Sequence, residues 1–274
     1  MSTAASPSTA TTPGAGLDPL ALYRKNHFLL RRLHSLTGIM PVGVFVIFHL
    51  FTNMQMALAE LLGDTHYFQE EVDFIHSLPA LLFLELFGLW LPIAFHAGLG
   101  VLYIFSGKSN SFSYKFGGNL RYTLQRWSAW LALAFIFFHV ATLRWGWTLG
   151  VIEYPFIGRA EGPSAMAAFG QESVPLAHAT TALSLQTNWA VALFYLVGAL
   201  AVVYHWSNGL WTAAITWGLT TTQKAMNRWG LVCLGMGLTL SAFTVAAVWG
   251  ALTYEIPDEL PGQIRTYLNL KAQE

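Results

Sequence analysis

Charged residues and cysteine are scarce in this chain of 274 residues. Only 10% of the residues are charged and 54% are hydrophobic, whereas a typical soluble domain is about 25% charged. The single cysteine, Cys233, excludes a disulfide framework, an iron–sulfur cluster held by cysteines and a cysteine-based zinc site. A covalently attached c-type haem is excluded too, because the chain has no C-x-x-C-H motif. The formal net charge of zero gives no basic surface for a nucleic-acid partner.

Long hydrophobic runs are present instead, and they predict an all-α integral membrane protein with a bundle of five transmembrane helices. The runs lie near 36–58, 78–106, 127–149, 189–218 and 229–252. Each has about 20 residues or more, enough to cross roughly 30 Å of hydrocarbon. We therefore expect a membrane domain over 31–253, a disordered or cytoplasmic arm over 1–30 and an outer tail over 254–274. The connections at 59–77 and 144–188 are expected to be loops, with room for a short interfacial helix in the longer one.

Basic residues favour one orientation in the membrane. The N-terminal arm carries four Lys or Arg residues, loop 59–77 carries none and loop 107–126 carries four. With the N-terminus in the cytoplasm and the C-terminus outside, ten of the 14 basic residues lie on the inner side. We expect this orientation.

Four histidines lie in four different predicted spans, where ionisable side chains are costly and usually mark a functional path. Counted along the helices, His49 and His139 lie near the outer ends of spans one and three, whereas His96 and His205 lie deeper in spans two and four. At about 1.5 Å per residue the two levels are on the order of 15–20 Å apart. The sequence therefore predicts two histidine pairs, His49 with His139 and His96 with His205.

Two imidazoles at one depth on facing helices are what an iron with two axial histidines needs. The sequence therefore predicts two non-covalent b-type haems whose irons are bound by the two pairs. A catalytic zinc would instead need about three converging ligands, which two separated pairs do not supply. A proton-coupled transporter that uses histidines as relays is a further alternative, and it predicts no visible absorption.

Several sequence segments resemble the cytochrome b membrane anchor of succinate:quinone oxidoreductases, which are the succinate dehydrogenases and fumarate reductases. They are R-R-L-H-S-L-T-G at 31–38, I-F-H-L-F at 47–51, S-L-P at 77–79, F-H-A-G-L-G at 95–100, F-H-V-A-T-L-R at 138–144 and Y-H-W-S-N-G-L-W at 204–211. The likeness covers roughly 31–250 and is closest to the type with a single five-helix anchor and two haems. A dihaem anchor of a hydrogenase or formate dehydrogenase remains an alternative.

The resemblance implies that His96 and His205 hold a proximal haem and that His49 and His139 hold a distal haem. It implies two partners on the cytoplasmic side, a flavoprotein subunit with FAD and the dicarboxylate site, and an iron–sulfur subunit. The anchor would pass electrons between these subunits and a membrane quinone. Likeness to the two-haem type implies that the quinone is menaquinone and that its site lies near the outer face. The implied location is a bacterial-type cytoplasmic (inner) membrane, with membrane lipid around the bundle.

Charged side chains at the ends of the spans are candidates for contacts with haem and quinone. Arg31, Arg32 and His34 at the inner end of span one could bind haem propionates, or act only as positive-inside anchors. Arg144, at the outer end of span three, is a candidate for a distal propionate or a quinone oxygen. Oxidation of a quinol releases protons, so Asp73 and His76 beside the start of span two are candidates for the proton-accepting group, although a solvated loop would look the same.

Glu85 is predicted to lie about 12 Å inside span two. It precedes His96 by 11 residues, about three turns of an α-helix, so we expect the two on one helix face, with Glu85 beside the outer haem and His96 at the inner one. A proton-transfer role and a packing role as a neutral, hydrogen-bonded carboxyl both remain open.

Overall fold

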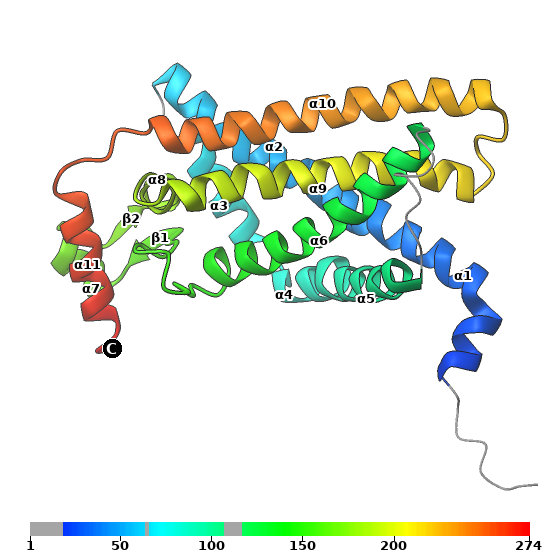
Figure 1. Ribbon diagram of the computed structural model, residues 1–274. Coiled ribbons are helices and arrows are strands. Elements are labelled where there is room, and N and C mark those ends of the chain that lie inside the picture. Colours follow the sequence, from blue (N-terminus) through cyan, green and yellow to red (C-terminus); the bar gives the residue numbers. More distant parts are fainter. Residues whose placement is uncertain (1–18, 64–65, 107–116) are drawn as a thin grey trace, which may run out of the picture.

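The structure is a computed structural model that describes residues 19–63, 66–106 and 117–274. Within these ranges five helical segments are long and apolar enough to cross a membrane: Lys25–Leu62, Leu81–Phe105, Gly117–Leu143, Trp189–Thr216 and Gln223–Thr253. They run lengthwise beside one another, and a smaller group of elements gathers at one end (Figure 1). The predicted all-α membrane bundle of five spans is confirmed.

The first span consists of two helices, α1 (Pro19–Ile39) and α2 (Pro41–Leu62). They are separated at Met40 because Pro41 has no backbone N–H to donate to the preceding turn. The helix begins well before the predicted span, so residues 19–30 of the arm that was expected to be disordered or cytoplasmic are helical. Residues 1–18 of the predicted arm lie outside the described residues.

The second span is interrupted by a π-helical turn. It consists of α4 (Leu81–Glu85), the π-helix η1 (Leu86–Trp90) and α5 (Leu91–Ser106). A π-turn bonds i to i+5 and takes up more residues per turn than an α-helix. Side chains before and after η1 therefore do not keep the spacing of an uninterrupted α-helix.

The third span, α6, runs over Gly117–Leu143, so the prediction of 127–149 was displaced toward the C-terminus. Its first turns carry Arg121 and Arg126, which made them resemble a loop, whereas Trp145 and Trp147 beyond its end made the following segment resemble a span. The last two spans are α9 (Trp189–Thr216) and α10 (Gln223–Thr253). Their N-termini are capped by side-chain oxygens of Asn188 and Thr222, which accept from backbone N–H groups of the first turn.

The connections predicted as loops and the predicted C-terminal tail fold into a compact structure at one end of the bundle, which we call the cap. It consists of α3 (His66–Ser77), β1 (Arg159–Glu161), α7 (Pro163–Phe169), β2 (Ser173–Pro175), α8 (Ala177–Gln186) and α11 (Leu260–Lys271). The two strands pair antiparallel, with Arg159 opposite Pro175. The start of α1 lies at the opposite end of the bundle (Figure 1).

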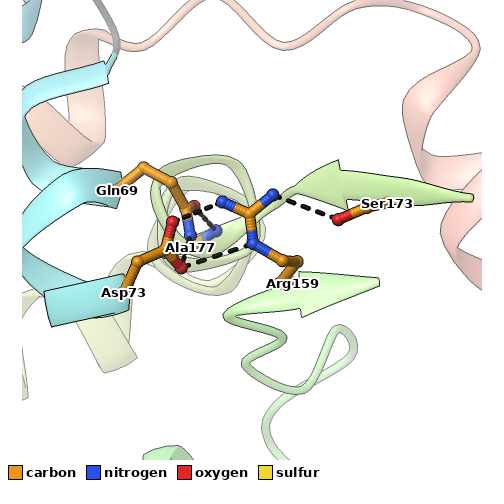
Figure 2. Close-up of polar contacts among 5 residues, drawn as sticks. All are labelled: Gln69, Asp73, Arg159, Ser173 and Ala177. Atoms are coloured by element: carbon orange, nitrogen blue, oxygen red, sulfur yellow. Dashed lines mark hydrogen bonds and ion pairs between the residues drawn. The ribbon is translucent and has the colours of Figure 1, made fainter. Parts of the chain in front are cut away.

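The cap has a hydrophobic core of its own. Tyr154, Leu176 and Leu183 of the 144–188 segment pack with Leu260, Ile264 and Tyr267 of the C-terminal segment. An ion pair adds to it: Arg159 on β1 bonds both carboxylate oxygens of Asp73 on α3, and its Nη1 lies 3.2 Å from Ser173 Oγ on β2 (Figure 2). The former loops are therefore a folded unit.

The bundle packs through small residues and turns apolar side chains outward. A Cβ at Gly250 of α10 would lie 2.4 Å from the backbone of α2, so only glycine allows the close approach of these helices. In contrast Leu82, Phe105 and Leu231 are 70% or more exposed. Such exposed apolar side chains suit contact with lipid tails.

Candidate functional site

The structure brings the imidazoles of His96 on α5 and His205 on α9 together. Their ring centroids are 6.1 Å apart. Metal–imidazole bonds are about 2 Å long, so one metal ion bound from both sides holds the ring centroids roughly 6 Å apart. His96 Nδ1 donates to the backbone oxygen of His34 (2.8 Å) and His205 Nδ1 to that of Gln125 (3.1 Å). When Nδ1 carries the proton, the other ring nitrogen, Nε2, keeps its lone pair for a metal.

His49 on α2 and His139 on α6 form a second pair, with ring centroids 5.6 Å apart. Phe45 stacks on the ring of His49 at 5.0 Å, and Phe135 lies 5.4 Å from the ring of His139. Asn53 Nδ2 donates to the backbone oxygen of His49 (2.7 Å) and lies 3.4 Å from its ring Nε2. The four histidines therefore meet in the two pairs predicted from their depth.

A cavity of about 460 Å³ opens beside His96 and His205 between α1, α2, α5, α6 and α9. Its walls are mainly apolar, with Val42, Ile93 and Leu133 among them, and polar side chains line it toward the α1 end. Pockets that hold a cofactor are of this size and character. An apolar slot with two facing imidazoles fits a non-covalent haem.

Close packing against glycine sets the position of His96. A Cβ at Gly38 of α1 would lie 2.4 Å from Cε1 of the His96 ring, which no real side chain permits. On α2, a Cβ at Gly43 would lie 2.0 Å from Trp206 Nε1, next in the chain to His205. The backbone of the first span therefore reaches the residues around this pair directly.

Comparison with known proteins finds a relative among the succinate dehydrogenase subunits. The chain is 33% identical over 222 residues to the succinate dehydrogenase cytochrome b558 subunit of Bacillus subtilis (strain 168). The match covers 81% of this chain and 96% of the relative. The chain belongs to the family of succinate dehydrogenase cytochrome b subunits. No family model matches it and no solved structure does.

The basic residues predicted at the inner end of this cytochrome b subunit divide into two groups. Arg31 and His34 line the cavity, and the His34 ring stacks on His96 at 4.0 Å. The Arg32 guanidinium instead lies over the rings of Phe28 (4.3 Å) and Trp217 (5.3 Å). Of the three candidates for propionate contacts at the inner end, only Arg31 and His34 therefore lie on the cavity wall.

Glu85 pairs with Arg144, a contact that the sequence did not predict. Arg144 Nε lies 3.2 Å from Glu85 Oε1 and Nη2 3.1 Å from Oε2, a two-pronged ion pair that joins α4 to the end of α6. The expectation that Glu85 shares a helix face with His96 was wrong in its premise, because the π-helix Leu86–Trp90 lies between them. Glu85 is therefore a charged partner of Arg144, not an isolated carboxyl in the bundle.

Asp73 and His76 lie on α3, within the cap. Burial alone would raise the pKa of Asp73, but hydrogen bonds from Arg159 and Gln69 outweigh it, so its pKa is lowered. His76 is exposed and lies beside Gly158, whose Cβ would be 3.7 Å from its ring. Asp73 is thus held as a carboxylate in the ion pair with Arg159.

Two cavity residues were missed by the sequence analysis. Gln125 and Arg126 lie next to each other on α6 and both line the cavity. Arg126 donates to Tyr122 Oη (2.7 Å) and to the backbone oxygen of Ile104. The available signal was their position in the polar stretch directly before the run that carries His139, but both were assigned to the end of a loop.

Proposed function

We propose that this chain is the dihaem, electron-transferring anchor of a succinate:quinone oxidoreductase. The observation that carries the proposal is the meeting of four intramembrane histidines from four spans in two facing pairs. Membership of the succinate dehydrogenase cytochrome b family supports it, and favours this complex over a hydrogenase or formate dehydrogenase. His96 and His205 would hold the proximal haem b, and His49 and His139 the distal haem b.

Haem iron supplies one-electron transfer when it is bound. The protein supplies the imidazoles, their orientation through the carbonyls of His34 and Gln125, and an apolar wall that excludes water. Arg31 and His34 would bind propionates at the cavity, and Arg144 at the cap end is the candidate for the distal haem or the quinone, in exchange with Glu85.

The proposed complex includes a flavoprotein subunit with FAD and an iron–sulfur subunit at the α1 end, on the cytoplasmic side. The dicarboxylate chemistry belongs to the flavoprotein, and the quinone chemistry belongs to this chain. The excess of basic residues at the α1 end supports a cytoplasmic N-terminus and an outer C-terminus in a bacterial cytoplasmic membrane.

Quinone would react at the cap end, close to the distal haem, and menaquinone is the proposed type. Asp73, His76 and Glu85 are the candidates for proton transfer there. Changing Asp73 or His76 is expected to slow quinone turnover, while reduction of an artificial acceptor by the flavin subunit continues because it bypasses the membrane. Equal loss of both activities would point to misassembly and count against a role in quinone chemistry.

The purified complex tests the proposal most directly. A reduced-minus-oxidised absorption spectrum should show b-type haem, and the ratio of haem to this chain should be two. An unrelated histidine serves as control: His27→Ala, an exposed residue on α1, should leave the ratio at two. A ratio of one, or no visible absorption, would contradict the dihaem proposal.

A further inference from the structure

Gln125 connects α6 to the ligand-bearing part of α9 through its side-chain amide. Its Nε2 lies 3.0 Å from the backbone oxygen of His205, and its Oε1 accepts from Asn208 Nδ2 at 2.7 Å. Asn208 is only 5% exposed, so no water competes freely for this bond. Both contacts lie within one turn of His205, which is the residue that the proposed function makes an axial ligand.

The same part of α6 also touches the His205 ring. The ring nitrogen Nδ1 lies 3.1 Å from the backbone oxygen of Gln125 and 3.2 Å from its side-chain Nε2. A carbonyl only accepts, so the first contact needs a proton on Nδ1. The side-chain amide donates, so the second contact needs an unprotonated Nδ1. The two contacts therefore belong to different tautomers of His205.

Only one of these tautomers can bind iron through Nε2, the ring nitrogen that does not face Gln125. With the proton on Nδ1 the Nε2 lone pair is free, whereas the other tautomer carries its proton on Nε2. The bond from Asn208 fixes which way the Gln125 amide faces, and the bond to the His205 backbone oxygen uses one of its two N–H groups. Together these two bonds hold the backbone carbonyl of Gln125 against α9, at hydrogen-bond distance from Nδ1 of His205.

We propose that Gln125 and Asn208 form a clamp that orients His205 for the proximal haem without touching the iron. Gln125 and Asn208 are thus positioning residues, and their role rests on the proposed function because it requires a haem iron at Nε2 of His205. The clamp acts on one haem only, since Gln125 and Asn208 make no contact described here with His49 or His139.

The test uses the purified complex and two variants. Gln125→Leu removes the hydrogen bonds of the side-chain amide to the His205 backbone oxygen and to Asn208. Asn208→Ala removes only the second of them. Loss of such an outer partner typically weakens metal binding by about 10- to 100-fold. We expect Gln125→Leu to lose one of its two haems to a haem-scavenging protein about 10- to 100-fold faster than the wild type does, with a changed low-spin EPR signal for that haem alone.

A matched pair elsewhere in the chain provides the control. Gln223 Nε2 donates to Asn227 Oδ1 at 2.8 Å in an exposed pair on α10 that touches no histidine. Gln223→Leu should leave both haem signals and both rates of loss unchanged. The double variant of Gln125 and Asn208 should be no worse than Gln125→Leu, because both residues act through one amide.

Unchanged haem retention and EPR signals in Gln125→Leu would overturn the clamp. So would equal changes in both haems, or failure of both variants to accumulate, because each would mean that the pair supports the whole bundle. Should only Gln125→Leu fail to accumulate, Asn208→Ala gives the same readout. Failure of the proposed function looks different: the wild type would lack two haems, or His205→Ala would retain both.

Discussion

The two histidine pairs come from the same bundle but are held in different ways. His96 and His205 each donate Nδ1–H to a backbone carbonyl of another helix. Around His49 and His139 the neighbours are mainly aromatic rings, and within the described residues the buried His139 Nδ1 has no hydrogen-bond partner. A carbonyl fixes both the tautomer and the plane of an imidazole, whereas ring packing fixes mainly its position. The first pair is therefore the more rigidly defined site.

Removal of a ligand should have the largest effect. His96→Ala or His205→Ala should remove one haem and His49→Ala or His139→Ala the other, because each leaves one axial position open. Haem-to-protein ratios and EPR spectra of purified variants measure this. We expect loss of the His96–His205 haem to reduce assembly with the cytoplasmic subunits more. Any single variant that keeps two haems with two axial histidines each would break the pairing.

A smaller effect is expected where the ligand is only displaced. Gly38→Ala adds a Cβ 2.4 Å from the His96 ring and should push it away from His205, which lowers the content of one haem. Gly98→Ala, on the same helix as His96, meets no atom within 4 Å and is the control. At the other pair, Gly198→Ala would meet the Phe135 ring at 2.4 Å and reach His139 only indirectly, so its effect should be milder. If Gly198→Ala lost as much haem as Gly38→Ala or more, the His96–His205 pair would not be the more rigidly defined of the two sites.

Glu85→Gln should leave both haems in place and slow quinone-linked turnover severalfold, because an amide cannot take up a proton at the cap end as the carboxylate beside Arg144 can. Turnover with quinone and with an artificial acceptor, measured across a pH range, separates a defect in quinone chemistry from a general loss of activity. Arg144→Lys keeps the charge but not the two-pronged bond, so it serves as the companion variant. Wild-type quinone rates at every pH in Glu85→Gln would exclude a proton-transfer role and leave a packing role.

The smallest effect concerns the Asp73–Arg159 pair of the cap. The lowered pKa of Asp73 means that the pair stabilises the cap above the unfolded pKa of about 3.9, and that this stabilisation is lost as pH falls through the lower folded value. Both side chains are about one-third exposed, so solvent screening limits the contribution to about 0.2–1 kcal/mol. Asp73→Asn should lower the thermal stability of the cap slightly at pH 7 and remove this acid dependence, as hydrogen exchange of α3 and β1 would show. An unchanged acid dependence would assign it to other groups.

Sequence periodicity and depth predicted the five spans and the two histidine pairs because both depend on local counts along single helices. The ion pair of Glu85 with Arg144 was out of reach, since it joins residues far apart in the chain, and Glu85 directly precedes a π-turn that composition does not reveal. The cap was missed for a similar reason. Its core joins Leu176 to Ile264 across two intervening spans, so neither segment alone contains the residues that form it.

The two-part construction of the cap also sets an order for its biogenesis. The segment with Tyr154, Leu176 and Leu183 is synthesised before α9 and α10, but its hydrophobic partners Leu260, Ile264 and Tyr267 follow after both. At about 5–20 residues per second the partners are delayed by several seconds. During this interval the apolar side chains of this earlier segment lack their partners from α11 and are exposed to chaperones and proteases. Completion of α11 is thus the step that covers the apolar side chains at this end of the protein.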